Sequence, residues 1–198
     1  MVPADIAQAL AEAGQRMDAR FWVPGSSGNL SARLDDSRIA ITRSGVHKGR
    51  LVPQTDIIAV DYAGRPLLEG QKPSAETLLH CQLYRMHASI GAVLHGHSVA
   101  ATVLSRFGPV IFSDYEILKA FGFDTHEHSV ALPVYDNNQN IAALAEQIEP
   151  DLRDRLPIGY AIVGHGVYAW GTNIEHAYWR LEALEFLLSC ELEQRQIK

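Results

Sequence analysis

The stretch Leu94–Ala100, "LHGHSVA", contains two histidines that are two positions apart and follow the apolar run "GAVL". Residues i and i+2 of a strand point to the same side, so His95 and His97 project together if the strand continues through Gly96. Neutral imidazole is a good ligand for Zn²⁺ and similar divalent cations. The pair therefore indicates a metal site at the end of a strand, although two solvated or hydrogen-bonded histidines would give the same pattern.

A third histidine occupies a similar place in "GYAIVGHGVYAWG", where His165 ends an apolar strand pattern between two glycines. Glycine permits a tight backbone and the close approach of another group. Three histidines at strand ends would supply the protein ligands of a catalytic zinc and leave one position for substrate. The rival pair is His126 and His128 in "DTHEHS", which no strand pattern precedes, so we expect it to be the weaker candidate.

Two carboxylates lie where helices are expected to begin. Glu76 is in the first turn of the helix predicted from "KPSAET", and Glu116 starts the short helix predicted from "EILKAFG". The helix dipole favours acidic side chains at such positions, so the residues alone give both an ordinary structural explanation. The remaining histidines are expected on helix surfaces or in a polar loop: His47, His80, His87 and His176.

Two small polar turns are candidates for anion binding. They are "SSGN" at Ser26–Asn29 and "RSG" at Arg43–Gly45. Turns of this kind can point backbone N–H groups and hydroxyls at an anion. They match neither the dinucleotide-binding spacing nor the P-loop spacing, so the turns alone do not identify a nucleotide site.

Strand and helix patterns alternate along the chain that surrounds these residues. Helices are expected over 5–21, 72–87, 99–107, 114–122, 140–156 and 172–194. Strands are expected within 28–34, 38–45, 56–70 (two strands around the turn "YAGR"), 90–95, 129–135 and 159–171 (a hairpin around "GHG"). This alternation favours a layered α/β domain.

Composition limits the class of protein. The chain has 198 residues, of which 47% are hydrophobic and 20% charged, as in a globular protein with a substantial core. We expect one domain over residues 1–198. The net charge of −6 and the lack of a basic block argue against a nucleic-acid partner. No apolar run approaches the ~18 residues that span a bilayer, and the N-terminus lacks a secretion pattern. Cys81 and Cys190 give no disulfide framework, so we expect a cytoplasmic protein.

Taken together, "SSGNLSAR", "ITRSG", "KPSAET", "LHGHS" and "GHGVYAWG", in this order, resemble the class II aldolase/adducin family over most of the chain. "SGVHKGRL", "YEILKAFG" and "THEHSVALPVYDN" are similar to the branch of that family that dehydrates a methylthio-substituted ketose 1-phosphate in methionine salvage. The resemblance implies a three-layer α/β/α sandwich on a mixed, mostly antiparallel sheet. It also implies a homotetramer with active sites at subunit interfaces. Gly96 is a small difference, because the family more usually has a bulkier residue there.

The resemblance further implies a role for individual residues. One Zn²⁺ per subunit would be bound by His95, His97 and His165. Glu116 would be the catalytic acid/base, and Glu76 would lie close to the metal, where the aldolases keep a catalytic carboxylate. The substrate phosphate would lie among the small polar turns, at Ser27, Gly28, Asn29, Ser44, Gly45 and Ser74.

The implied reaction converts 5-methylthioribulose 1-phosphate to 2,3-diketo-5-methylthiopentyl 1-phosphate and water, through a metal-stabilised enediolate. A class II sugar-phosphate aldolase of the fuculose or ribulose phosphate type, with Glu76 as the central acid/base, is the alternative enzyme. A non-catalytic scaffold, as in the adducin branch, is the alternative of another class. Iron, manganese and cobalt stay open beside zinc. The candidates for binding the methylthio group are Tyr115, Phe121 and Trp170.

Overall fold

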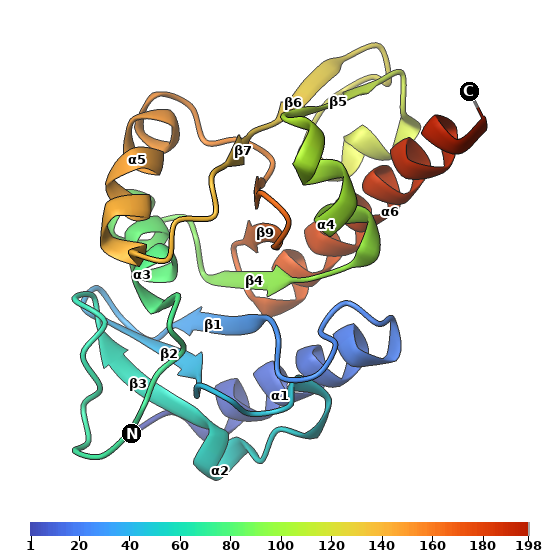
Figure 1. Cartoon of the computed structure of the whole chain (residues 1–198). Helices are drawn as coiled ribbons and strands as arrows, with labels where there is room; N and C mark the ends of the chain where they lie inside the picture. The colour runs from blue at the N-terminus through green and yellow to red at the C-terminus, as the bar shows by residue number, and fades with distance from the viewer. Residues whose placement is uncertain (198) are drawn as a thin grey trace.

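In the computed structural model, which describes residues 1–197, a seven-stranded sheet forms the middle layer (Figure 1). The strand order is β3-β2-β1-β4-β9-β8-β7, and every neighbouring pair is antiparallel except the parallel pair β7 and β8. This confirms the expected mixed, mostly antiparallel sheet. The strands are β1 (Asn29–Arg33), β2 (Arg38–Thr42), β3 (Ile57–Asp61), β4 (Ala92–Gly96), β7 (Val134–Tyr135), β8 (Tyr160–Ile162) and β9 (Gly166–Gly171).

Helices cover both faces of the sheet because its strands direct apolar side chains to both sides. In β4, Leu94 belongs to the core beneath one set of helices, whereas Val93 belongs to the core on the opposite face. The first set is α1 (Ala4–Ala19), α4 (Val99–Leu104) and α6 (Ile174–Ile197), and the second is α3 (Thr77–Met86) and α5 (Ile141–Asp154). The three-layer α/β/α arrangement is therefore confirmed.

The shorter elements lie at the edges of these layers. They are η1 (Lys48–Arg50), α2 (Pro53–Asp56), η2 (Ser105–Phe107) and η3 (Glu116–Phe121), together with a separate antiparallel ribbon of β5 (Val110–Ser113) and β6 (Ser129–Leu132). η3 connects the two strands of the ribbon and packs against α6. Within residues 1–197, no helix combines the length and the apolar character needed to cross a membrane.

Two predicted strands differ in the structure. The single strand expected over 129–135 is divided at Pro133, so that β6 joins the ribbon and β7 joins the main sheet. Proline has no N–H to donate to a ladder and restricts the residue before it, which explains the break. The second strand expected after "YAGR" is reduced to an isolated bridge between Val60 and Pro66.

The start of α3 also differs from the prediction, and the difference places Glu76. The backbone carbonyl of Ser74 accepts hydrogen bonds from the Thr77 N–H (3.2 Å) and hydroxyl (2.6 Å), so the helix begins at Thr77. Glu76 therefore precedes the first turn, and its side chain does not cap the helix.

α6 buries one carboxyl group against the end of β4. Glu185 is 2% exposed, and neither of its carboxyl oxygens has a hydrogen-bond partner in the described part of the chain. A Cβ at Gly96 would lie 3.6 Å from Glu185 Oε1, so the glycine leaves room for this side chain. Burial raises the pKa of Glu185 to about 7, and the Ser98 hydroxyl offsets only part of that effect.

Because the pKa of Glu185 is higher in the folded chain than in the unfolded chain, its stabilising contribution is complete at low pH. It is lost as the pH rises through about 7. Glu185→Gln is neutral throughout. We expect its advantage in free energy of unfolding over the wild type to grow by roughly 2–3 kcal/mol between about pH 5 and about pH 8.5.

Urea unfolding at the two pH values measures this difference. The matched control is Glu193→Gln, which changes an exposed glutamate of the same helix and should give no such growth. A constant stability difference between Glu185→Gln and the wild type would contradict the prediction.

Candidate metal centre and anion site

The register of three neighbouring strands aligns the first residues of the site. Asn29 of β1 pairs with His95 of β4, and His95 pairs with Tyr168 of β9. Side chains that are directly opposite in a sheet lie on the same face. The Tyr168 ring stacks on the His95 imidazole with ring centroids 3.9 Å apart and planes 13° apart, so packing holds the imidazole in place.

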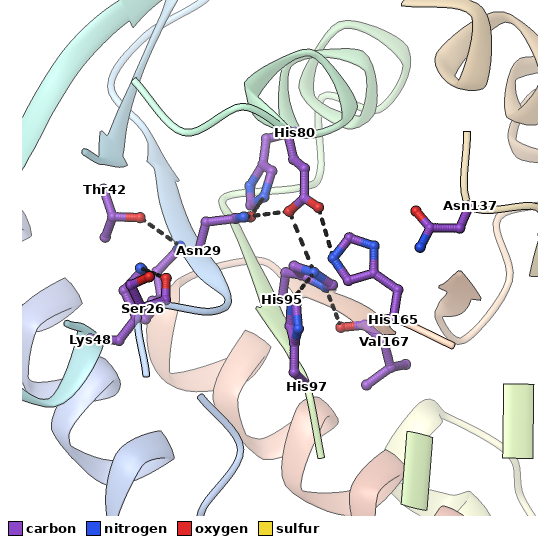
Figure 2. A network of polar contacts seen from close by, with 12 residues as sticks. Ser26, Asn29, Thr42, Lys48, His80, His95, His97, Asn137, His165 and Val167 are labelled. Carbon is purple, nitrogen blue, oxygen red and sulfur yellow. Dashed lines mark hydrogen bonds and ion pairs between the residues drawn. The ribbon is translucent and has the colours of Figure 1, made fainter. Parts of the chain in front are cut away.

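Three imidazoles converge at this end of the sheet (Figure 2). His95 and His97 come from the end of β4, and His165 comes from the turn between β8 and β9. The ring centroid of His97 is 4.5 Å from those of both His95 and His165, and one nitrogen of each residue lies within 4.8 Å of the other two. The structure thus brings together the three histidines that the sequence singled out.

The protonation states of these imidazoles suit a cation. Burial lowers the pKa of His95 to about 4, although Glu76 acts in the opposite direction. Burial and the neighbouring His95 lower the pKa of His97 to about 3. Both rings are therefore neutral near pH 7, and each has a nitrogen with a free lone pair.

The Nε2 atoms of His95 and His97 face each other. His95 Nδ1 donates a hydrogen bond to the Val167 carbonyl oxygen (3.0 Å), which assigns the lone pair to Nε2. His95 Nε2 is 2.8 Å from His97 Nε2. At this distance the two nitrogens share a hydrogen bond whose donor depends on the His97 tautomer, and a divalent cation that displaced its proton would bind both nitrogens.

A carboxylate borders the three histidines. Glu76 Oε1 is 3.0 Å from His165 Nε2, and Glu76 Oε2 is 3.4 Å from His95 Nε2. Burial opposes ionisation of Glu76, but the two imidazoles and the Asn29 amide hold its pKa well below the usual range. The ionised carboxylate can therefore neutralise a cation or exchange a proton with a ligand of that cation.

A chain of hydrogen bonds through Asn29, His80 and Ser31 orients the Glu76 carboxylate. Asn29 Nδ2 donates to Glu76 Oε2 (2.5 Å), so the Asn29 side-chain oxygen is the acceptor for His80 Nε2. His80 Nδ1 then accepts from the Ser31 hydroxyl (2.7 Å), which is 2.8 Å from the Tyr84 hydroxyl. Burial lowers the pKa of His80 to about 4, which agrees with its neutral role in the chain.

The prediction of a surface position for His80 is therefore wrong, because its side chain is fully buried. The i, i+4 spacing of His80 and Tyr84 on the helix was the available signal, since it places both on one face.

The predicted polar turns meet beside the histidines. Lys48 Nζ donates to the carbonyl oxygens of Ser26 (2.9 Å) and Val46 (2.7 Å), and so connects the turn before β1 to the turn after β2. The Ser44 N–H donates to the Lys72 carbonyl (3.0 Å), which connects the second turn to the segment of Ser74. All six predicted anion-binding residues belong to these three connected segments: Ser27, Gly28, Asn29, Ser44, Gly45 and Ser74.

Gly28 allows the first of these turns to pack against β4, the strand that carries His95. Its φ is +70°, and a Cβ there would lie 2.6 Å from the His95 carbonyl oxygen and from a Val23 side-chain carbon. Only glycine fits this conformation and this close approach without strain.

Lys48 was not singled out from the sequence, although it lies in the quoted motif "SGVHKGRL". It is 2% exposed, and burial lowers the pKa of its ammonium to about 8, with Glu76 acting in the opposite direction. The Ser27 hydroxyl is also buried and has no hydrogen-bond partner among residues 1–197. A buried ammonium and a free hydroxyl among these turns suit an anion.

Glu116 is not brought to the histidines within one chain. Its side chain is 72% exposed. Glu116 Oε1 is 2.5 Å from Lys119 Nζ, and Glu116 Oε2 is 4.0 Å from His126 Nδ1. Lys119 lowers the pKa of the Glu116 carboxyl. No hydrogen bond or ion pair between described residues joins Glu116 to the histidine cluster. His126 and His128 are exposed or nearly so, and they form no three-ligand group within residues 1–197.

The chain is similar to known proteins over most of its length. The family model of the class II aldolase and adducin N-terminal domain matches residues 8–192. A methylthioribulose-1-phosphate dehydratase of Acidiphilium cryptum (strain JF-5) is 56% identical, over 100% of this chain and 94% of its own. One of Granulibacter bethesdensis is also 56% identical, over 94% and 90%. The crystal structure of an L-fuculose-1-phosphate aldolase from Thermus thermophilus matches with a TM-score of 0.79 and 25% identity, over 98% of this chain and 96% of that one.

His95→Ala removes a nitrogen donor from the cluster, so we expect this variant to bind its divalent metal at least about tenfold more weakly than the wild type. The metal content after dialysis, measured by mass spectrometry on folded protein, checks this. The matched control is His126→Ala, which changes the exposed rival pair and should keep the wild-type metal content. If only the control variant lost its metal, the metal site would have to be assigned to His126 and His128.

Lys48→Met keeps a similar unbranched shape but removes the ammonium. We expect it to bind inorganic phosphate roughly ten- to a hundredfold more weakly, because a hydrogen bond to a charged group contributes ~1.5–3 kcal/mol. Wild-type affinity should fall as the pH rises through about 8, where the Lys48 ammonium loses its proton, and the variant should lack this step.

Calorimetric titration with phosphate on both sides of that pH measures the affinities. The control is Lys72→Met, which removes an exposed lysine close to the same turns. Equal weakening in the two variants would show a general charge effect and contradict the role given to Lys48.

Proposed function

The chain belongs to the class II aldolase and adducin family, and we propose that it dehydrates 5-methylthioribulose 1-phosphate to 2,3-diketo-5-methylthiopentyl 1-phosphate. The observation that carries this proposal is the 56% identity to a methylthioribulose-1-phosphate dehydratase over the whole chain. The proposal treats residues 1–198 as one catalytic domain. The unpaired Cys81 and Cys190 are compatible with a reaction in the reducing cytoplasm, as part of methionine salvage.

The proposed cofactor is one Zn²⁺ per subunit, held by His95, His97 and His165. The family is metal-dependent, and these three side chains form a cluster that could bind a metal. Three imidazoles with room for a further ligand match the donor set of catalytic zinc. Bound there, the cation would supply Lewis acidity to the substrate oxygens at C2 and C3.

The proposed phosphate site is the group of three connected turns: Ser27, Gly28, Asn29, Ser44, Gly45 and Ser74. We add Lys48, because its ammonium is the buried positive charge that joins two of these turns. A phosphate held there by backbone N–H groups, hydroxyls and one ammonium would fix the C1 end of the ketose.

Dehydration requires two proton transfers. A base removes the proton at C3, and an acid protonates the hydroxyl at C4, which leaves as water. We assign the acid/base work to Glu116 of a neighbouring subunit in a homotetramer. The exposure of Glu116 and its separation from its own chain's histidines support this assignment, because both leave the carboxylate free to enter another subunit's site. Glu76 would orient the substrate and neutralise the cation.

A sugar-phosphate aldolase is the second candidate, and the position of Glu76 favours it. An aldolase needs an acid/base beside the metal to break C3–C4, and Glu76 is the carboxylate that contacts the histidines within one chain. The complete histidine cluster makes a non-catalytic scaffold the weakest alternative.

One assay separates these candidates. Zinc-loaded protein is incubated with 5-methylthioribulose 1-phosphate, and the diketone and any aldehyde from C3–C4 cleavage are followed in parallel. We expect the diketone without cleavage. Cleavage products instead would support the aldolase, and no reaction in a protein that retains tightly bound zinc would require another substrate.

The shared site predicts complementation between two inactive variants. Glu116→Gln should keep its metal and lose turnover, and His95→Ala should lose both. Co-expressed in equal amounts, they form mixed tetramers in which a site is complete when intact histidines meet an intact neighbouring Glu116. Because each condition holds for one half of the subunits, we expect about one quarter of wild-type activity.

Glu116→Gln co-expressed with itself as a differently tagged copy is the control and should stay inactive. Retained turnover in Glu116→Gln alone would remove the acid/base assignment. Inactive mixed tetramers with a normal metal content in half of the subunits would show that Glu116 does not act across the interface.

A further inference from the structure

A small cavity lies against the histidine cluster and has no role in the chemistry described above. Its volume is about 80 Å³. Glu76 and His165 form the wall that it shares with the cluster, and Ala75 extends that wall. The rest of the lining comes from the loop before α5, from α5 itself and from β8: Asn137, Gln139, Ile141, Leu144 and Ile162.

The floor of this cavity is apolar and its mouth is open. Leu144 and Ile162 are fully buried and belong to the core between the sheet and α3/α5, so the floor is well packed. Ala75, Asn137 and Gln139 are exposed and surround the opening. A ligand can therefore enter from the solvent and reach a dry apolar end.

The cavity extends from the histidines on the side away from Lys48 and the first two polar turns, while the third turn, which contains Ser74, adjoins the cavity at Ala75. Figure 2 shows Ser26, Asn29 and Lys48 on one side of the cluster and Asn137 beyond His165 on the other side. A ligand whose anionic group occupies the turns and whose middle carbons lie at the histidines would extend its other end toward the cavity.

We propose that this cavity binds the methylthio group of the substrate. The inference rests on the proposed function, in which C1 carries the phosphate, C2 and C3 lie at the histidines and C5 carries the sulfur. A thioether is polarizable, donates no hydrogen bond and accepts only weakly, so it suits an apolar floor. A hydroxyl in the same place would lose its hydrogen bonds to water.

The size of the cavity sets an upper limit on the substituent. Its 80 Å³ exceeds the space of one water molecule, about 30 Å³ in the liquid, so a group of two heavy atoms fits. The closed floor formed by Leu144 and Ile162 excludes a long chain.

The methylthio candidates from the sequence do not line this cavity. Trp170 is buried in the core, and Tyr115 and Phe121 lie at the two ends of the segment of Glu116. The proposal assigns the methylthio contact within one chain to Ala75, Ile141, Leu144 and Ile162, whereas Tyr115 and Phe121 would accompany Glu116 to a neighbouring subunit's site.

Two unreactive probes test the inference by binding alone. 5-Methylthioribitol 1-phosphate and ribitol 1-phosphate differ only at C5, and neither has the C2 carbonyl that dehydration requires. Calorimetry on zinc-loaded wild type should give at least about tenfold tighter binding of the methylthio probe. In Ala75→Phe, which fills the mouth, this preference should fall below about threefold.

A third probe and two further variants complete the design. Ile141→Ala enlarges the cavity, so it should bind 5-propylthioribitol 1-phosphate about tenfold better than the wild type does. Ala142→Phe is the matched control, because Ala142 is exposed, adjoins Ile141 and does not line the cavity. It should keep the wild-type preference.

The possible outcomes distinguish a failure of the cavity assignment from a failure of the proposed function. Wild type that binds neither phosphate probe and forms no diketone would overturn the proposed function. A second set of results would overturn the cavity assignment alone. In it, the wild type forms the diketone, Ala75→Phe keeps the wild-type methylthio preference, and Ile141→Ala still does not bind the propylthio probe. Equal weakening of both shorter probes by Ala75→Phe would also overturn it.

Discussion

A buried carboxylate beside neutral imidazoles is the interaction on which the site depends. Removing an ionised Glu76 from water is costly unless hydrogen bonds and an opposite charge compensate for it. Asn29 and His165 supply the hydrogen bonds, and no lysine or arginine forms an ion pair with Glu76 within residues 1–197. The buried carboxylate and the three converging imidazoles therefore suit the same partner, a divalent cation.

The register of the sheet maintains this interaction. Asn29 and His95 are paired across β1 and β4, and each strand divides its side chains between the two faces of the sheet. A slip of one residue would turn Asn29 to the opposite face and would direct the apolar residues of β1 away from their core. The same alternation that stabilises the three layers thus places the Asn29 amide against Glu76.

Sequence patterns predicted the parts of the site that depend on local order. The i, i+2 spacing at the end of β4 predicted that His95 and His97 project together, and the glycines around His165 indicated the third candidate ligand. His80 and Lys48 were missed because their partners, Asn29 and the Ser26 carbonyl, are remote in sequence or belong to the backbone. The break in the predicted strand at Pro133 could have been predicted from the proline itself. In contrast, β5, which was not predicted, has no distinctive sequence pattern. Glu116 could be assigned a catalytic role only by resemblance, because its ion-pair partners within residues 1–197, Lys119 and His126, do not connect it to the histidines.

The three parts of the site come from different elements, and this separation explains how one fold accommodates different substrates. The turns before β1, after β2 and before α3 form the proposed anion site, and strands β4 and β9 with the turn between β8 and β9 hold the histidines. α5 and its preceding loop close the small cavity. Changes in α5 or its loop can alter the cavity without moving the histidines, because β4 is anchored in the sheet on both sides. A structure with 25% identity, that of an L-fuculose-1-phosphate aldolase, keeps the fold over nearly the whole chain. Under the proposed function, specificity at C5 would depend on one helix and one loop, and the metal chemistry on the sheet.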